Sequence, residues 1–327
     1  MHAILVTETG GPEVLRLAEV PDPEPGPGQL LVDVASAGVN YIDTYHRSGL
    51  YPVQVPFIPG SEAAGTVSAL GEGVEEFAVG DRVAWAMGSG TYAEKAVVDA
   101  ERAVPVPEDV DPELAGGVLL QGMTAHYLTT STHPVQAGET VLVHAAAGGM
   151  GLLLTQLARA RGARVIGTVS TAEKERLARE FGADEVIRYT EVDDLAGEVR
   201  GLTGGKGVAA VYDGVGAATF DASLASLRLR GMLALYGAAS GPVPPVDPQR
   251  LNSAGSVFLT RPSLPHYTAS RDELLWRAGE VFDAVRGGSL RIRIGGRYPL
   301  AEARRAHEDL QGRRTTGKLL LLPHGTS

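Results

Sequence analysis

The glycine-rich stretch at 144–151 is the segment whose residue types and spacing most clearly suggest chemistry. It reads His144-Ala145-Ala146-Ala147-Gly148-Gly149-Met150-Gly151, directly after an apolar run and directly before an amphipathic segment. Small residues let the backbone approach a pyrophosphate, and the free N–H groups at a helix N-terminus attract its negative charge. Gly148 and Gly151 match the last two glycines of G-x-G-x-x-G, whereas Ala146 replaces the first. The motif predicts that a dinucleotide binds at Ala147, Gly148, Gly149, Met150 and Gly151; a tight turn with a purely structural purpose is the alternative.

The end of the next apolar run bears on the choice between nicotinamide cofactors. NAD-selective sites place an Asp or Glu there, which binds the ribose hydroxyls and repels a 2′-phosphate. Here the run ends Gly167-Thr168-Val169-Ser170, without a carboxylate, and Lys174 follows in the next segment. A hydroxyl and an ammonium favour a 2′-phosphate through hydrogen bonding and charge pairing. Ser170 and Lys174 therefore predict NADPH rather than NADH, with Lys174 as an ordinary solvated helix residue being the alternative.

The composition argues against a metal centre. The chain has no cysteine, which removes disulfides, thiolate nucleophiles and every cysteine-ligated metal site. Eight histidines remain, but none forms an H-x-x-x-H or comparable pair, and a lone histidine is more often structural. We predict no metal.

Strands and helices alternate regularly from residue 140 onward. Apolar runs predict strands at 140–144, 164–168, 185–188, 208–212 and 232–236, and helical spacing predicts helices at 150–161, 171–181, 192–202 and 218–229. This alternation requires right-handed crossovers and a parallel sheet with helices on both faces. We therefore predict a doubly wound Rossmann domain within an α/β protein. Further candidates for nucleotide contacts are Tyr189, Gly237 and Arg314.

The first 120 residues have a different pattern. Short strands are predicted at 30–34, 65–70, 82–86 and 92–98, separated by glycine-rich turns, which is typical of a mainly antiparallel β domain. A helix is predicted at 113–130 between the two regions, and the C-terminal part adds a helix at 272–286 and a strand at 318–322. We expect this last part to fold back onto the first domain.

Length and charge limit the possible partners. A chain of 327 residues and 34.2 kDa is long enough for two domains. The net charge of −10 argues against nucleic-acid and anionic-membrane surfaces. The N-terminal MHAILVTETG lacks a basic segment followed by a long apolar one, and no apolar stretch reaches membrane-spanning length. We therefore expect no membrane association and a cytoplasmic location.

Several longer strings, in order along nearly the whole chain, resemble one family. They are GGPEVL at 10–15, GVNYIDTY at 38–45, RSGLYP at 47–52, the turn at 145–151 and TRPSL at 260–264. The chain resembles the medium-chain dehydrogenase/reductases, and among them the zinc-free quinone oxidoreductases typified by zeta-crystallin. The resemblance implies a GroES-like, mainly β catalytic domain at 1–122, a Rossmann NADP-binding domain at 123–260, and a return segment at 261–327 that completes the catalytic domain. It also implies an active cleft between the domains and NADPH-dependent reduction of a quinone.

The same resemblance implies that zinc is absent. In the zinc-dependent relatives a cysteine and a Gly-His-Glu segment supply metal ligands. The corresponding positions here are Asn40 and Gly60-Ser61-Glu62. The cysteine and the histidine are both missing, so catalytic zinc is not expected.

The resemblance also suggests residues for the reaction. Asn40, Tyr45 and Tyr51 are expected to line the acceptor pocket, with the amide and the phenols donating hydrogen bonds to a quinone carbonyl. Arg261 is similar to the family arginine near the cofactor, and Gln121 and Thr124 are expected beside the nicotinamide. We count Asn40, Tyr45, Tyr51, Thr124 and Arg261 as catalytic and Gln121 as cofactor-binding. For the two tyrosines, packing in the core of the β domain is an equal alternative.

Two other functions remain open from the sequence. One is an NADPH-dependent enone or alkenal double-bond reductase, which would differ in pocket shape rather than in motif. The other is a non-catalytic RNA-binding or structural crystallin-like protein, which the acidic composition weakens. The resemblance further implies a homodimer or homotetramer built on an edge of the Rossmann sheet.

Overall fold

The computed structural model describes residues 1–325, which divide into two compact units. The central domain is Thr124–Tyr267, and the terminal domain is Met1–Met123 together with the chain from Thr268 onward. The second boundary therefore lies later than the 260/261 division expected from the sequence. Tyr267 belongs to the central domain because its ring stacks on Tyr127, with 4.1 Å between centroids, and its hydroxyl accepts a hydrogen bond from Thr132 (3.0 Å).

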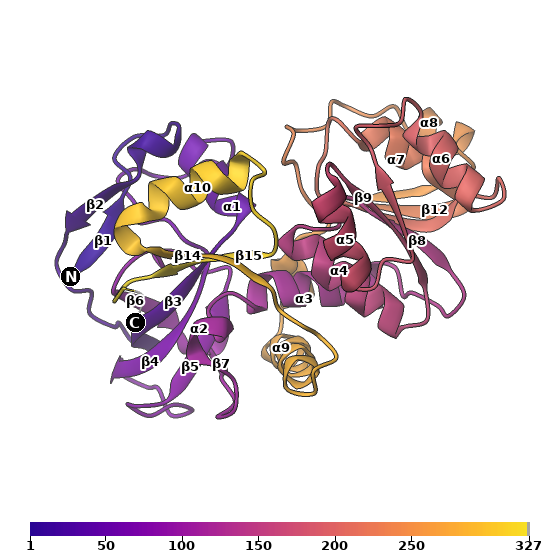
Figure 1. The fold of residues 1–327 in the computed structure, drawn as a ribbon. Helices are drawn as coiled ribbons and strands as arrows, with labels where there is room; N and C mark the ends of the chain where they lie inside the picture. The colour runs from indigo at the N-terminus through magenta and orange to yellow at the C-terminus, as the bar shows by residue number, and fades with distance from the viewer. Residues whose placement is uncertain (326–327) are drawn as a thin grey trace. The chain divides into compact units, whose positions relative to one another are not determined.

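The central domain is built on a six-stranded sheet in which every pair of neighbouring strands is parallel, in the order β10-β9-β8-β11-β12-β13. Its strands are β8 (Thr140–Val143), β9 (Arg164–Val169), β10 (Glu185–Arg188), β11 (Val208–Asp213), β12 (Leu227–Leu235) and β13 (Phe258–Thr260). Its helices are α4 (Gly149–Ala160), α5 (Ala172–Glu180), α6 (Leu195–Leu202), α7 (Phe220–Ser226) and α8 (Gln249–Ser253). The strand order reverses between β8 and β11, so right-handed crossovers put α4 and α5 on one face and α7 on the other (Figure 1). The predicted doubly wound fold is confirmed.

Three predicted helices differ from the structure, and of these the helix expected at 192–202 begins only at Leu195. The helix expected at 218–229 ends at Ser226, because Leu227 already begins β12 and is buried. The helix expected at 113–130 is divided into α2 (Pro112–Ala115) and α3 (Leu119–Tyr127), followed by one π-helical turn at Leu128–Thr132. The division falls at Gly116, where a Cβ atom would lie 2.9 Å from the Ser36 carbonyl carbon. A close backbone approach, which helical spacing does not reveal, therefore interrupts the helix.

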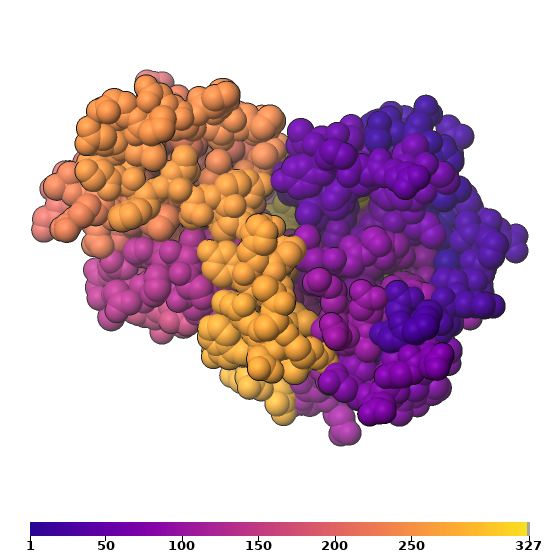
Figure 2. Space-filling view, turned by 180° about the vertical axis from the view of Figure 1, so that it is seen from behind, coloured from indigo at the N-terminus to yellow at the C-terminus, as the bar shows by residue number. Residues whose placement is uncertain are grey.

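The terminal domain is built on a seven-stranded, mainly antiparallel sheet in the order β14-β15-β3-β4-β5-β7, with β6 paired to β3. Its strands are β3 (Gln29–Val39), β4 (Glu62–Leu70), β5 (Arg82–Ala86), β6 (Lys95–Asp99), β7 (Val104–Pro105), β14 (Ile294–Pro299) and β15 (Lys318–Leu322), and β1 (His2–Leu5) pairs with β2 (Arg16–Glu19) separately. Its other helices are α1 (Tyr41–Ser48), α9 (Arg271–Arg286) and α10 (Ala303–Gln311). Strand β15 lies between β14 and β3, so the C-terminal segment folds back as expected (Figure 1). In Figure 2 the first third of the chain, in indigo and purple, forms one continuous surface.

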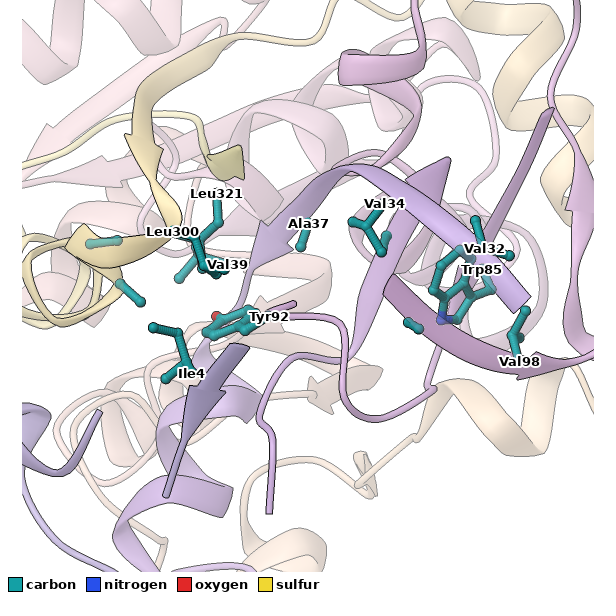
Figure 3. Close-up of a cluster of buried hydrophobic side chains, with 14 of the residues drawn as sticks. Ile4, Val32, Val34, Ala37, Val39, Trp85, Tyr92, Val98, Leu300 and Leu321 are labelled. Atoms are coloured by element: carbon teal, nitrogen blue, oxygen red, sulfur yellow. The ribbon is translucent and has the colours of Figure 1, made fainter. Parts of the chain in front are cut away.

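Strand β3 organises the core of this domain. Val32 and Val34 are buried at even positions, whereas Ala37 and Val39 are buried at odd positions. The pairing of β3 with β4 shifts register between Val34 and Ser36, and this bulge moves the core-facing side of the strand from even to odd positions. Figure 3 shows these side chains with Trp85 and other core residues along the strand. Because of the bulge, buried residues from both halves of β3 pack in the same core, and Asn40 follows directly after the strand.

Within residues 1–325, no helix is both long enough and apolar enough to cross a membrane.

Candidate active site

The glycine turn lies at the end of β8, where the sequence placed it. Gly148 is the N-cap residue of α4, and Ala145 adopts a positive φ of 50°. A Cβ atom on Gly151 would lie 2.6 Å from Cα of Ala146, so only glycine lets the first turn of the helix pack against the preceding loop. The backbone thus presents a helix N-terminus with small side chains, as a pyrophosphate requires.

The predicted 2′-phosphate residues lie together at the end of β9. Lys174, in the first turn of α5, directs its Nζ to Oγ of Ser170 (3.4 Å). Tyr189 joins them because its backbone N–H donates to the Val169 carbonyl (3.1 Å). The ammonium of Lys174, the hydroxyl of Ser170 and the backbone of Tyr189 therefore lie at the carboxyl ends of β9 and β10. This is a donor set that suits a phosphate next to an adenosine.

Gly237 follows β12 at the same end of the sheet. A Cβ atom there would lie 2.8 Å from Cα of Gly214, which follows β11. The two loops therefore approach each other closely beside the strand ends, where ligands bind in doubly wound sheets.

A buried polar network below the glycine turn was missed by the sequence analysis. His144 contacts Thr168 Oγ1 through Nδ1 (3.0 Å) and Ser223 Oγ through Nε2 (2.9 Å), and Ser223 donates to Asp213 Oδ2 (2.7 Å). Burial lowers the pKa of His144, partly offset by the charge of Asp213. The network ties β8, β9, β11 and α7 together. Polar residues at the ends of three otherwise apolar strands were the available signal.

A second buried network surrounds Asn40 in the terminal domain. Asn40 Nδ2 donates to Glu62 Oε1 (2.8 Å) and to the Gly38 carbonyl (3.3 Å), and Oδ1 accepts from Gln121 Nε2 (3.3 Å). The ammonium of Lys318 donates to Asn40 Oδ1 (2.8 Å) and forms an ion pair with Glu62. Asn40 and Gln121 therefore lie together, and both amide N–H groups of Asn40 already have partners inside the domain.

The backbone of Asn40 is held from the other side by Asp43, whose Oδ2 accepts its N–H (2.8 Å). Tyr92 also donates to Oδ2 of Asp43 (2.9 Å), and His307 Nε2 contacts the Tyr92 hydroxyl (3.1 Å). Arg47 donates to His307 Nδ1 (3.0 Å); because Arg is only a donor, the proton of the neutral ring is on Nε2. Burial raises the pKa of Asp43 to about 6, while burial and the Arg47 charge lower the pKa of His307 to about 3. A directed chain of hydrogen bonds therefore joins α10 to α1.

The two predicted tyrosines pack against each other. The rings of Tyr45 and Tyr51 meet edge to face with 5.2 Å between centroids, and His46 lies 6.0 Å from Tyr51. This aromatic group follows Asn40 directly along α1 and the next turn.

The remaining predicted residues are divided between the domains. Thr124 and Arg261 belong to the central domain, with Arg261 directly after β13, and Gln121 and Arg314 belong to the terminal domain. Arg314 is mostly exposed, with Nε 3.8 Å from Asp309. Across residues 1–325, no group of three or more His, Cys, Asp or Glu side chains is arranged to hold a metal ion.

Two family models match the chain. The model described as "Alcohol dehydrogenase GroES-like domain" matches residues 26–108, and the one described as "Zinc-binding dehydrogenase" matches residues 149–267. These ranges lie in the terminal and central domains, respectively. The expected combination of a GroES-like and a Rossmann domain is therefore confirmed.

Individual relatives match over almost their full lengths. A protein named quinone oxidoreductase from Pseudomonas aeruginosa is 47% identical over 318 residues, which cover 96% of this chain and 97% of that protein. A 2-haloacrylate reductase from a Burkholderia species is 44% identical, covering 98% of both chains. A mycobacterial protein solved in complex with NADPH is 59% identical, with a TM-score of 0.96 over 99% of this chain and 100% of that one. The chain belongs to the quinone oxidoreductases of the medium-chain dehydrogenase/reductase superfamily.

Proposed function

We propose that this protein reduces quinones with electrons from NADPH and does so without zinc. The observation that carries the choice of cofactor is the pairing of Lys174 with Ser170 at the end of β9, where an NAD-selective site would have a carboxylate. The mycobacterial relative bound to NADPH supports the same choice. The relative named quinone oxidoreductase, at 47% identity, supports the acceptor.

The residues of the central domain fit such a cofactor. The N–H groups at the start of α4 and the small residues Ala147–Gly151 would hold the pyrophosphate. Ser170 and Lys174 would bind the 2′-phosphate, and Tyr189 would lie against the adenine. When bound, the reduced nicotinamide supplies a hydride or single electrons to the acceptor. Gln121, Gly237 and Arg314 stay predictions for further cofactor contacts.

The residues we propose for the acceptor end are Asn40, Tyr45, Tyr51, Thr124 and Arg261. The phenols of Tyr45 and Tyr51 would donate hydrogen bonds to a carbonyl oxygen as negative charge develops on it. Since the amide N–H groups of Asn40 are engaged by Glu62 and Gly38, we assign Asn40 to orienting its neighbours rather than to donating to the acceptor.

Zinc independence is supported by the residues at the former ligand positions. Asn40 and Glu62 contact the ammonium of Lys318, and the chain has no cysteine. The ammonium of Lys318 therefore supplies the positive charge between these two residues. Metal analysis of active protein, and activity after treatment with a chelator, would test this part: zinc at one equivalent per chain together with loss of activity on chelation would contradict it.

A steady-state assay tests the reaction. NADPH oxidation is followed with 1,4-benzoquinone, 9,10-phenanthrenequinone, a trans-2-alkenal and 2-chloroacrylate, and each is repeated with NADH. We expect turnover of the quinones and a preference for NADPH. Turnover of the alkenal or of 2-chloroacrylate with no activity toward either quinone would overturn the proposal.

Turnover of the alkenal or of 2-chloroacrylate without quinone activity would favour a double-bond reductase. The 44% identity to a 2-haloacrylate reductase supports this alternative, because it extends over 98% of the chain. The same cofactor site would serve both reactions, so the acceptor series above distinguishes them.

We also propose a homo-oligomer that uses the β13 edge of the central sheet. Phe258 on the edge strand β13 is 57% exposed, and Leu229 on the neighbouring strand β12 is 74% exposed. Large exposed apolar side chains at and beside an open strand favour association with a second chain. The cytoplasmic location stays a prediction.

A further inference from the structure

Lys318 is a buried lysine that the proposed chemistry does not yet use. It is the first residue of β15, and the register of β15 against β3, in which Leu319 faces Val39, brings it opposite Asn40. Its side chain is 2% exposed. Lysine is almost never buried so completely unless it is paired, because removing an ammonium from water is costly. The groups that contact the Lys318 ammonium therefore indicate its role.

The ammonium connects three segments of the chain. It contacts Glu62 at the start of β4 and Asn40 at the end of β3. Glu62 in turn accepts the backbone N–H of Leu120 through Oε2 (2.8 Å), and Asn40 accepts the side-chain N–H of Gln121 (3.3 Å). The start of α3 is therefore attached to the sheet through these two acceptors.

The ammonium also favours one orientation of the Asn40 amide, the same one that the acceptors Glu62 and Gly38 select from the Nδ2 side. An ammonium is only a donor, so the amide must turn Oδ1 toward Lys318, and Nδ2 then faces the Glu62 carboxylate (2.8 Å). With Oδ1 in this place, Gln121 has an acceptor for its side-chain N–H. In the reverse orientation Nδ2 would face the donors of Lys318 and Gln121, and Oδ1 would face the Glu62 carboxylate, so the ammonium is one of the groups that hold the amide.

We propose that Lys318 is a positioning residue for the acceptor reaction. Its ammonium fixes the Asn40 amide and the Glu62 carboxylate, and through them the segment of α3 that carries Gln121. This role rests on the proposed function, in which Asn40 and Gln121 belong to the site. Lys318 acts through these neighbours and need not touch the acceptor.

The test must separate positioning from simple charge balance. Lys318→Met alone leaves the Glu62 carboxylate buried without its cation, which destabilises the fold. The double variant Glu62→Gln/Lys318→Met removes both charges, so most of the lost melting temperature should return, while the donor to Asn40 is still missing. Lys318→Arg keeps the charge, and Lys95→Met in the same domain is the matched control because Lys95 pairs with Asp22 at the surface.

For each variant, kcat and KM for a quinone, the Kd for NADPH and the melting temperature are measured. We expect kcat of the double variant to stay roughly tenfold or more below wild type, although its melting temperature recovers. The Kd for NADPH should change much less than kcat, because the proposed phosphate-binding residues belong to the central domain and only the contact of Gln121 would be affected. Lys318→Arg should restore part of kcat, and Lys95→Met should behave as wild type.

A kcat that recovers together with the melting temperature would show that Lys318 only balances charge, and would overturn the proposal. If wild type reduces none of the acceptors, the proposed function fails instead. Hydrogen–deuterium exchange of the segment 119–121 then still decides the role of Lys318. Faster exchange in the folded double variant than in Glu62→Gln alone supports positioning, and equal exchange in these two variants overturns it.

Discussion

Gly38 is a residue whose lack of a side chain makes room for a carboxylate. A Cβ atom there would lie 2.7 Å from Cδ of Glu62, which is held by Asn40, Lys318 and the backbone of α3. We expect Gly38→Ala to displace Glu62 and to lower the free energy of unfolding by about 1–3 kcal/mol, as overpacking does, with a loss of kcat. Urea unfolding and the quinone assay measure the two effects.

Gly279→Ala provides the matched control. Gly279 lies within α9 of the same domain, and no heavy atom outside its own helix is within 4 Å of its added Cβ. Replacing a helical glycine should stabilise the protein by up to about 1 kcal/mol. If both variants unfolded at the same urea concentration as wild type, the close approach at Gly38 would not affect the free energy of unfolding.

Lys174 is the residue expected to select the phosphorylated cofactor. Lys174→Ala should weaken NADPH binding roughly tenfold, equivalent to ~1.4 kcal/mol, because one charge-assisted hydrogen bond is lost. NADH has no 2′-phosphate, so its affinity should not change. Fluorescence titration with both cofactors measures the preference, and Lys206→Ala, at an exposed lysine of the same domain, is the control. An equal loss for both cofactors would remove the assignment.

At the scale of elements, α1 and α10 are joined by groups with opposite pH dependence. Burial raises the pKa of Asp43 from 3.8 to about 6, so the folded protein holds a proton there that the unfolded chain has lost. This contribution to stability is present at low pH and is lost as the pH rises to about 6. Burial lowers the pKa of His307 from 6.5 to about 3, so its contribution is present above 6.5 and is lost as the pH falls. The two effects oppose each other between about pH 4 and 6.

Single substitutions of Asp43 and His307 should therefore change the pH dependence of stability in opposite directions. On lowering the pH from 6 to 4, Asp43→Asn should lose stability relative to wild type, by up to about 1.4 kcal/mol per pH unit. His307→Gln should gain relative to wild type over the same range. Urea unfolding at several pH values measures this. Two variants whose stability ran parallel to wild type would contradict the pKa values of the buried pair.

The sequence predicted the elements best where one segment decides its own structure. The strands at 82–86, 185–188 and 318–322 were predicted with their observed bounds, because each is a short, strongly apolar or β-branched run between turn residues. The helices at 113–130 and 218–229 were predicted too long, because Gly116 is constrained by Ser36 and Leu227 joins β12. Both constraints come from distant segments and leave no periodic signal.

For the candidate site too, local features could be predicted and contacts between distant segments could not. The glycine turn and the pair of Ser170 and Lys174 could be predicted, since strand, turn and helix follow one another in the sequence. The partners of Asn40 could not all be predicted. Lys318 reaches it across 278 residues through the pairing of β15 with β3, and only the register of that pairing indicates the contact.

At the scale of the whole molecule, the exposed edge of β13 predicts self-association. Phe258→Lys puts a charge on this edge, where pairing with a second copy would bury it. We expect wild type to have at least the mass of a dimer by light scattering after size-exclusion chromatography, and Phe258→Lys to have that of a monomer. Leu275→Lys, at an exposed leucine of α9, is the control and should leave the mass unchanged. A wild-type protein with the mass of a monomer would contradict this prediction.

The pairing of β15 with β3 also affects how the protein is made. Strand β3 leaves the ribosome early, but residues 37–39 pair with β15, which begins at Lys318. The continuous central domain can complete its sheet while the N-terminal strands still present an open edge. Open edges invite association with other chains. Residues 37–39 of β3 therefore stay unpaired on this side until β15 has been synthesised.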